Sequence, residues 1–285
     1  MNILITGCKG QLGREMQLLS QEHAAHCYFF TDVQELDITD PAAIEACVAD
    51  NRINLIVNCA AYTAVDKAES DQALCALLNA TAPRHLAEAA QHHGAGLIHI
   101  STDYVFDGTA HVPYQEDHLV NPQTIYGHTK AEGEEAVRQA CEQYAIVRTG
   151  WLYSPWGNNF VKTMLRLGHE REELGVIFDQ IGTPTSARSL ARALYAIIGQ
   201  GIQTGTYHFA GEGVASWYDF TLAIHRLAGI TTCRVRPLHT EEYPTPAHRP
   251  HYSVLDKTKF KQTYGLTIPH WMESLRECIQ ELENK

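Results

Sequence analysis

Short apolar runs alternate with longer segments of helical periodicity along the first half of the chain. The apolar runs are NILIT (2–6), CYFFT (27–31), NLIVNCA (54–60), GLIHIS (96–101) and YAIVRT (144–149). They are apolar on both faces, which is typical of strands that helices cover on each side. Segments 71–93 and 128–143 instead repeat apolar positions about every 3.6 residues and predict crossover helices. The alternation predicts an α/β fold with a doubly wound parallel sheet.

The turn after the first apolar run reads TGCKGQLG and carries the glycines Gly7, Gly10 and Gly13. Glycines permit a tight turn and let a pyrophosphate approach the backbone, where the N–H groups of the following helix favour an anion. The spacing departs from the G-x-G-x-x-G fingerprint, so a turn that serves packing alone is the alternative. Between a strand and a helix, the motif predicts a Rossmann-type dinucleotide-binding domain.

The regular alternation of strand and helix patterns ends at about residue 150. Beyond it, the stretches 151–159, 179–185 and 242–250 are rich in loop-forming residues. We therefore expect the dinucleotide-binding domain over residues 1–150 and a smaller, mainly substrate-binding lobe over 151–285. The helical pattern near 186–199 and the run TYHFA (206–210) leave open whether residues 186–210 return to the main sheet.

Acidic residues follow the second apolar run. Asp32 lies about 20 residues beyond the glycines, where an acid commonly binds the adenosine ribose hydroxyls. An acid at this place repels a 2′-phosphate, so it favours NADH, although Asp32 capping a turn is an equal alternative. Asp37 and Ile38 form a second candidate pair for the adenine edge.

Small, polar and aromatic residues follow the third and fourth apolar runs. Ala60 and Ala61 leave room for a flat ligand, although small residues are also ordinary in a core. Thr102, Asp103 and Tyr104 end the fourth run. Open α/β sheets bind ligands in the crevice at the carboxyl ends of their strands, so we expect these residues to share one site.

Tyr126 and Lys130 are four residues apart in TIYGHTK, and a helix would place both on one face. An isolated pair of this kind is usually a solvated lysine beside a half-buried tyrosine. Together, however, they could protonate a carbonyl oxygen while a hydride reaches its carbon. An ammonium ~4 Å away at an effective dielectric near ~20 favours phenolate by about 4 kcal/mol, which lowers the phenol pKa by roughly three. Thr102 could hydrogen-bond the developing alkoxide.

These residues resemble the extended short-chain dehydrogenase/reductases. The similarity lies in TGxxGxxG (6–13), NxAA (58–61), STDYVF (101–106) and YxxxK (126–130). More narrowly, AAYTAVDKAE (60–69), STDYVFDG (101–108), NNFVKTML (158–165) and YPTPAHRP (243–250) resemble the dTDP-4-dehydrorhamnose reductase family. The resemblance spans nearly the whole chain. It implies reduction by NADH or NADPH of the C4 ketone of dTDP-6-deoxy-L-lyxo-4-hexulose to dTDP-L-rhamnose, a precursor of cell-surface polysaccharides.

The resemblance also implies roles for individual residues. Tyr126 would donate the proton, Lys130 would lower its pKa and hold the nicotinamide ribose, and Thr102 would polarise the carbonyl. The residues it places on the cofactor are Gly10, Gln11, Leu12, Asp37, Ile38, Ala60, Ala61 and Tyr62. The residues it places on the sugar nucleotide are Thr102, Asp103, Tyr104 and Trp151, with Arg249 a candidate for the diphosphate, although core packing or an exposed loop could equally explain Tyr104, Trp151 and Arg249.

One departure from the family concerns metal. Some members bind Mg²⁺ through a glutamate at the position of Glu15 and an acidic pair near 188, which supports a dimer. Here the later positions are Arg188 and Ser189. Mg²⁺ is therefore doubtful, no metal ligand is predicted, and we expect a monomer or a weak homodimer.

The composition of the chain argues against some classes of binding partner. The formal charge of −11 and the scattered Lys and Arg argue against a nucleic-acid partner. No apolar run approaches the ~20 residues of a membrane helix, and NILIT at the start does not look like a signal peptide. The eight cysteines show no C-x-x-C spacing. We expect a cytoplasmic protein without a membrane partner.

Two alternatives remain at this point. A sugar-nucleotide dehydratase or epimerase would share the fold, but a dehydratase needs an Asp-Glu pair after the threonine, and here Asp103 and Tyr104 follow Thr102. A non-catalytic regulatory subunit, such as that of methionine adenosyltransferase, would share much of the pattern. The complete set of Thr102, Tyr126 and Lys130 favours an enzyme.

Overall fold

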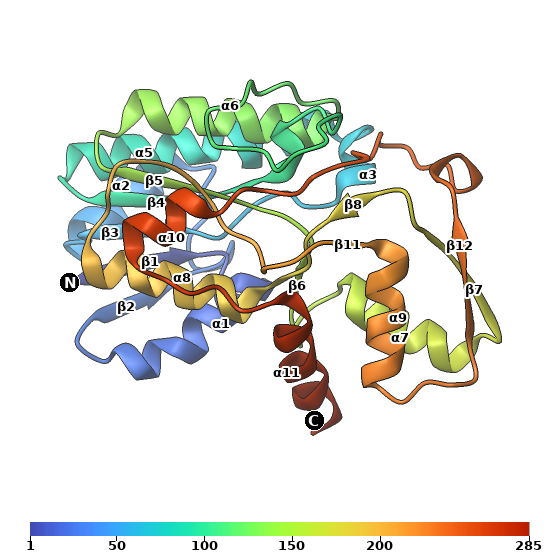
Figure 1. Cartoon of the computed structure of the whole chain (residues 1–285). Coiled ribbons are helices and arrows are strands. Elements are labelled where there is room, and N and C mark those ends of the chain that lie inside the picture. The colour runs from blue at the N-terminus through green and yellow to red at the C-terminus, as the bar shows by residue number, and fades with distance from the viewer. Residues whose placement is uncertain (285) are drawn as a thin grey trace.

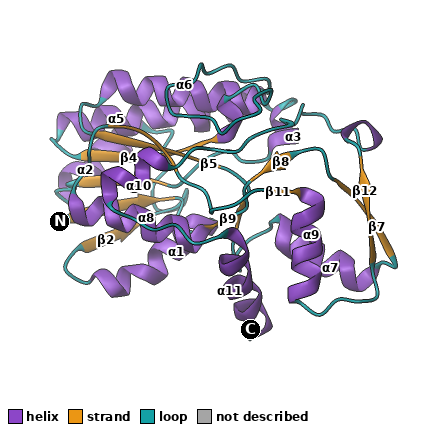
Figure 2. Ribbon diagram, viewed as in Figure 1, coloured by secondary structure: helices purple, strands orange, loops and turns teal. Residues whose placement is uncertain are grey.

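A six-stranded, wholly parallel sheet forms the centre of the protein, whose computed structural model describes residues 1–284 (Figures 1 and 2). Its strand order is β10-β5-β4-β3-β1-β2. The order reverses at β1 and β3, which is where open sheets of this kind bind ligands. The strands are β1 (Asn2–Thr6), β2 (Cys27–Phe30), β3 (Leu55–Asn58), β4 (Gly96–Thr102), β5 (Tyr144–Thr149) and β10 (Gly205–His208).

Helices cover both faces of the sheet, as the apolar runs predict. On one face α1 (Gln11–Leu19), α8 (Ala187–Gln200) and α10 (Thr258–Tyr264) bury a core that includes Ile3, Ile5 and Leu194. On the other face α2 (Pro41–Asp50), α5 (Ala82–His92) and α6 (Ile125–Ala140) pack on Leu4, Ile56 and Leu97. The predicted fold class, an α/β fold with a doubly wound parallel sheet, is confirmed.

Residues 186–210 belong to this sheet rather than to the second lobe. α8 packs against α1, and β10 lies beside β5 with Tyr207 opposite Val147. The side chains of Leu190, Leu194 and Ile197 are fully buried, so the apolar face of α8 completes the core on its side of the sheet.

The second lobe joins three helices to short two-stranded sheets (Figure 1). Its core includes Phe220, Leu275 and Trp271. The helices are α7 (Phe160–Glu170), α9 (Trp217–Leu227) and α11 (Trp271–Glu283). The strands pair as β7 (Glu173–Ile177) with β12 (Arg234–Leu238), β8 (Ile181–Gly182) with β11 (Ala215–Ser216), and β6 (Leu152–Tyr153) with β9 (Thr185–Ser186).

Two helices of the structure differ in their bounds from the helices that the sequence predicts. The segment 71–93 is divided into α4 (Gln72–Ala76), a π-helical turn η2 (Leu77–Thr81) and α5. Helix α6 begins at Ile125 instead of 128 because the side chain of Thr124 accepts a hydrogen bond from the Gly127 N–H and caps the helix. Tyr126 and Lys130 therefore both lie on α6.

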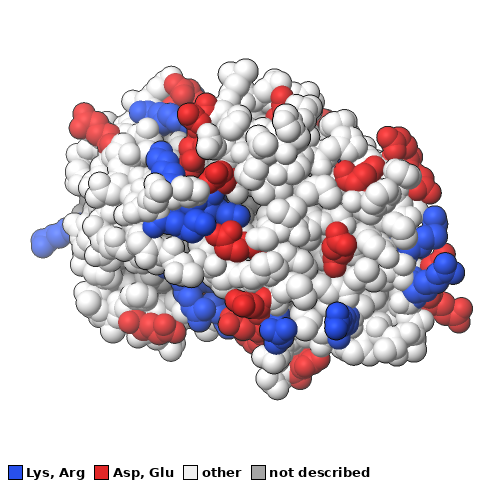
Figure 3. Space-filling view, viewed as in Figure 1, with Lys and Arg blue, Asp and Glu red and all other residues white. Residues whose placement is uncertain are grey.

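The remaining short elements are α3 (Val65–Ala68) and the 3₁₀ turns η1 (Ser20–His23), η3 (Asp103–Val105) and η4 (Thr240–Glu242). On the face shown in Figure 3, basic and acidic side chains are interspersed. Within residues 1–284, no helix has the length and apolar character needed to cross a membrane.

Candidate active site

A cavity of about 930 Å³ lies at the carboxyl ends of the central strands and extends to the second lobe. Its lining contains most of the predicted site residues: Gly7, Gly10, Gln11, Leu12, Asp32, Asp37, Ile38, Ala60, Ala61, Thr102, Asp103, Tyr104, Tyr126, Lys130 and Trp151. Among the described residues, the predicted ones outside this lining are Gly13, Tyr62 and Arg249. The cavity therefore brings together segments that are far apart in the sequence.

The glycine turn shapes one end of the cavity. Gly7 has φ +65°, and a Cβ there would lie 2.7 Å from the Ala60 nitrogen. A Cβ on Gly13 would overlap the carbonyl oxygen of Gly7. Helix α1 begins after Gly10 without a side-chain cap, so its first N–H groups can meet an anion. This end of the cavity suits the pyrophosphate of a dinucleotide.

Asp32 lies at the same end and also supports the turn. Its carboxylate accepts the N–H of Lys9 at 3.0 Å and the N–H of Val33 at 2.9 Å. It lines the cavity as well, so both interpretations of this residue have structural support. Lys9, which the sequence did not single out, also lines the cavity and pairs with Glu35 at 3.1 Å.

Tyr126, Lys130 and Thr102 meet where α6 crosses the end of β4. Burial raises the pKa of Tyr126, and a hydrogen bond with Thr102 offsets part of this rise. Burial lowers the pKa of Lys130 to about 8, and its ammonium donates to the carbonyl of Ile100 at 2.6 Å. Burial therefore opposes the lowering of the phenol pKa that we expected from Lys130, and on balance the pKa of the phenol is raised.

The hydroxyl of Thr102 is part of a small polar network. It donates to the Asp103 carboxylate at 3.0 Å and accepts the N–H of Tyr104 at 3.2 Å. Asp103 is only 3% exposed, and burial raises its pKa to about 6. The other carboxylate oxygen of Asp103 lies so close to Gly150 that a Cβ there would come within 2.5 Å of it.

Trp151 forms a wall of the cavity in a strained backbone conformation. Its φ is +51°, which is unfavourable for a bulky side chain and persists only where the surroundings enforce it. The indole stacks on Trp217 with ring centroids 3.4 Å apart, and a Cβ on Gly182 would lie 2.5 Å from it. Trp217, which sequence reasoning missed, therefore holds Trp151 in place.

Arg249 is committed to protein partners. Its guanidinium donates to the Tyr104 hydroxyl at 3.0 Å and to the Asp66 carboxylate at 2.7 Å. The N–H of Ala247 also donates to Asp66 at 3.3 Å. Arg249 thus ties the segment 243–250 to α3 and orients Tyr104.

The second lobe contributes residues that the site prediction omitted. Gly157, Asn158 and Asn159 line the cavity. The amide oxygen of Gln11 accepts hydrogen bonds from Ser154 at 3.0 Å and Asn159 at 2.9 Å. Gln11 therefore joins α1 to this loop, and the available signal was the loop-rich stretch 151–159.

The position expected to bind Mg²⁺ in some relatives is filled by an ion pair. Glu15 is fully buried and accepts hydrogen bonds from the Trp156 indole and from Arg188, both at 2.9 Å. Arg188 also pairs with Glu281 at 2.6 Å. A cation would have to replace the guanidinium, so these residues do not fit a magnesium site.

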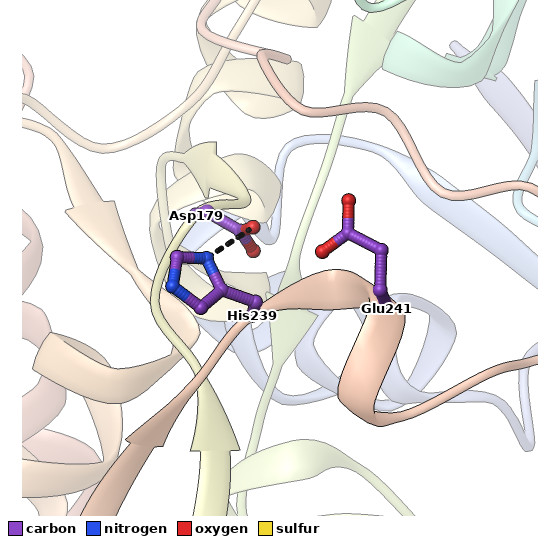
Figure 4. Close-up of side chains that lie close together, drawn as sticks. All are labelled: Asp179, His239 and Glu241. Carbon is purple, nitrogen blue, oxygen red and sulfur yellow. Dashed lines mark ion pairs between the residues drawn. The ribbon is translucent and has the colours of Figure 1, made fainter.

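Asp179, His239 and Glu241 form a second group of potential metal ligands (Figure 4). Asp179 lies 3.5 Å from His239 but already accepts two hydrogen bonds from Thr240. The side chain of His239 is 63% exposed. The potential ligand atoms of the three residues lie within 4.8 Å of one another, but Figure 4 marks an ion pair only between Asp179 and His239. These three residues are therefore better explained as ordinary polar surface side chains than as a metal site.

Known proteins match the chain over its full length. The family model described as the RmlD substrate binding domain matches residues 1–284. The dTDP-4-dehydrorhamnose reductase of Escherichia coli K12 is 41% identical, over 99% of this chain and 98% of the relative. The crystal structure of a dTDP-4-dehydrorhamnose reductase from Clostridium acetobutylicum has a TM-score of 0.96 and 48% identity, and covers 99% of this chain and 100% of that one.

The dTDP-4-dehydrorhamnose reductase of Bacillus anthracis, solved in complex with NADP, has a TM-score of 0.94 and 40% identity, with 98% of this chain and 99% of that chain covered. These matches agree with the motifs on which the resemblance rested. The chain therefore belongs to the dTDP-4-dehydrorhamnose reductase family.

Proposed function

We propose that this protein reduces the C4 ketone of dTDP-6-deoxy-L-lyxo-4-hexulose to dTDP-L-rhamnose with NADH or NADPH, the last step of dTDP-rhamnose biosynthesis. The observation that carries the proposal is one continuous cavity. A glycine turn and an uncapped helix N-terminus form one end, and Thr102, Tyr126 and Lys130 lie further along it. Relatives that match over the full chain bear the name of this activity.

The residues present fit a nicotinamide dinucleotide. The N–H groups that follow Gly10 would hold the pyrophosphate, while Asp32, Asp37 and Ile38 would surround the adenosine. The nicotinamide half would lie against Ala60 and Ala61, which line the cavity, with Lys130 on its ribose, while Tyr62 lies outside the lining and would support this loop. When bound, the reduced cofactor supplies the hydride that C4 receives.

Tyr126 supplies the proton. Because burial raises its pKa, the phenol is protonated near neutral pH and can donate to the C4 oxygen as the carbonyl becomes an alcohol. The charge left on the phenol oxygen is then stabilised by the Lys130 ammonium, which is mostly protonated at pH 7 because its pKa is about 8. Thr102 can donate a hydrogen bond to the C4 oxygen of the substrate once its hydroxyl turns from Asp103.

The sugar would lie against Asp103, Tyr104 and Trp151. Tyr104 is held by Arg249, and Trp151 by its stacking on Trp217. The guanidinium of Arg249 is already held by Asp66 and by the Tyr104 hydroxyl. We therefore infer that its first role is to orient Tyr104, and we retain diphosphate binding as a second.

A direct assay tests the proposal. Purified protein is incubated with the dTDP-ketosugar and either NADH or NADPH, and oxidation of the cofactor is followed. We expect substrate-dependent oxidation that Tyr126→Phe nearly abolishes. Cofactor binding without any oxidation in the wild type would instead support a regulatory subunit.

A further inference from the structure

Glu134 is a fully buried carboxylate on α6, one helical turn after Lys130. Residues four apart share one face of a helix, and both of these side chains reach the end of β4. The Lys130 ammonium donates to the carbonyl of Ile100 at 2.6 Å. The hydroxyl of the next residue, Ser101, donates to the Glu134 carboxylate at 2.6 Å. The carboxylate therefore lies close to the site where we place the proton transfer, although Glu134 is not part of the cavity lining.

Two arginines hold the Glu134 carboxylate. Arg148 binds both of its oxygens, with the Nε atom at 2.8 Å and a terminal nitrogen at 2.7 Å. Arg138 donates to the same carboxylate at 2.7 Å. Together with the bond from Ser101, these contacts engage the carboxylate and leave the Lys130 ammonium directed at β4 and the cavity.

Stability alone does not explain this buried ion pair. The free energy needed to remove two charges from water is about as large as the gain from their attraction, and apolar residues of the same volume often stabilise a core equally well. Arg148 is only 1% exposed, so the loss of hydration applies to both partners. The position of the pair, one turn from a buried ammonium, instead indicates an electrostatic role toward that ammonium.

Several titratable groups around Lys130 are neutral near pH 7. His99 of β4 and Cys75 of α4 interact electrostatically with Lys130. Burial lowers the pKa of His99 well below its usual value and raises that of the Cys75 thiol, so neither carries a charge. On the cavity side, burial raises the pKa values of Tyr126 and Tyr104. These four side chains therefore supply no charge to balance the ammonium.

Glu134 and Asp103 are the carboxylates in these surroundings. Burial alone would raise the pKa of Glu134, but the hydrogen bonds and charge of Arg148, together with the other donors, hold it below its usual value. Burial raises the pKa of Asp103 to about 6, so this residue loses its charge in mildly acidic solution. Burial lowers the pKa of Lys130 to about 8, and the charge of Glu134 offsets part of this fall.

We propose that Glu134 is a positioning residue whose buried carboxylate keeps the Lys130 ammonium charged at neutral pH. Arg148 holds this carboxylate in place, so that the ammonium stays available to the cofactor ribose and to the phenol oxygen of Tyr126. The proposal rests on the proposed function where it concerns rate. The charge of Lys130 itself can be measured without turnover.

The principal test is Glu134→Gln, which keeps the size of the side chain and removes its charge. NMR of protein labelled with ¹³C-lysine follows the protonation of Lys130, whose signal is the one missing from Lys130→Arg. We expect the midpoint of this titration at about pH 8 in the wild type. It should fall by roughly one pH unit in Glu134→Gln, because a nearby negative charge no longer favours the ammonium. An unchanged midpoint would overturn the proposal.

Two control variants separate the charge of Glu134 from its shape. Glu135→Gln removes the same charge from the next residue of α6, whose side chain is 57% exposed and pairs with Arg138 at 3.4 Å. Solvent screens this charge, so the midpoint should stay within about 0.2 of the wild-type value. Glu134→Asp keeps the charge on a shorter side chain and should hold the midpoint within about 0.3. A fall in either control as large as in Glu134→Gln would contradict the proposal.

A double variant covers the case in which Glu134→Gln does not fold, since that change leaves Arg148 buried without its counter-ion. Glu134→Leu combined with Arg148→Met replaces both charges by apolar side chains of similar volume, an exchange that proteins often tolerate. The midpoint of Lys130 should again fall, by roughly half a pH unit or more. A midpoint equal to that of the wild type would overturn the proposal.

The pH dependence of the rate gives a second readout. In Glu134→Gln, the alkaline decline of kcat should begin roughly one pH unit lower than in the wild type. An equal loss of kcat at every pH, with no movement of the decline, would show that Glu134 serves only the structure. If the wild type binds NADPH but does not reduce the ketosugar, the proposed function fails, while the NMR midpoints still decide the role of Glu134.

Discussion

Burial reverses the order of the pKa values of Tyr126 and Lys130. It raises that of the phenol and lowers that of the ammonium to about 8. Near pH 7 the phenol therefore keeps its proton and the amine keeps its charge. This is the combination that a reduction needs, because the proton must be available before the hydride arrives.

Tyr126→Phe removes the hydroxyl and keeps the ring. We expect ketosugar reduction to fall by ~10²–10⁴-fold, as for other positioned proton donors, while NADPH affinity stays within about twofold. Steady-state kinetics and a binding titration measure the two effects. Near-wild-type turnover would remove Tyr126 from the mechanism.

The pH dependence of kcat should report Lys130. The pKa of Lys130 is about 8, so its ammonium loses a proton as the pH rises through 8. We therefore expect kcat to decline above pH 8. Titration of Lys130 should cause no decline below that pH. Lys130→Arg should move the decline to higher pH, because a guanidinium remains charged. A decline at the same pH in both proteins would assign it to another group.

Asp32 should influence cofactor choice. Its carboxylate lines the end of the cavity where we propose that adenosine binds, and it would repel a 2′-phosphate there, so we expect NADH to be at least as effective as NADPH. Asp32→Ala should shift the ratio of the two kcat/KM values toward NADPH by roughly tenfold, or about 1.4 kcal/mol. An unchanged ratio would show that Asp32 serves only the turn with Lys9.

At the scale of elements, the strands and the glycine turn follow from local pattern, and the structure confirms the fold class they predicted. Thr124 also signals the start of α6, although the periodicity placed that start later. The π turn and the left-handed Trp151 do not follow from local sequence, because tertiary contacts enforce both. The sequence pattern predicted an effect of the Lys130 charge on the phenol pKa but not the opposing effect of burial, because burial depends on tertiary packing.

The close contact between α6 and η2 predicts different effects on stability for two glycine-to-alanine variants. Gly133→Ala should lower the free energy of unfolding by ~1–3 kcal/mol, because its Cβ overlaps the carbonyl of Asn79. Gly199 lies near the end of α8, and a Cβ there would meet nothing within 4 Å. Gly199→Ala should be neutral or stabilise by up to ~1 kcal/mol. Equal effects of the two variants in denaturant melts would refute the contact.

At the scale of the molecule, α1 holds the second lobe to the sheet. Gln11 bonds Ser154 and Asn159, while Glu15 accepts a hydrogen bond from the Trp156 indole. Both side chains reach across from the helix that begins at the cofactor end of the cavity. The sequence predicted Gln11 as a cofactor-binding residue, and in the structure it also joins the two lobes.

The Glu15–Arg188 pair should make the enzyme independent of divalent cations. The Arg188 guanidinium lies 2.9 Å from the Glu15 carboxylate and would repel a cation, so EDTA should leave the reductase rate within about twofold. We also expect sedimentation to show a monomer or a weak homodimer that chelation does not alter. A dimer that dissociates in EDTA would show that other carboxylates bind a metal.

The most direct test of the central claim is the identity of the product. NMR of the nucleotide sugar formed from dTDP-6-deoxy-L-lyxo-4-hexulose and NADPH reports both the reduction and the configuration at C4. The proposed function predicts dTDP-L-rhamnose, formed in equal amount to the NADPH oxidised. Recovery of the unreduced ketosugar, or formation of the C4 epimer, would contradict it.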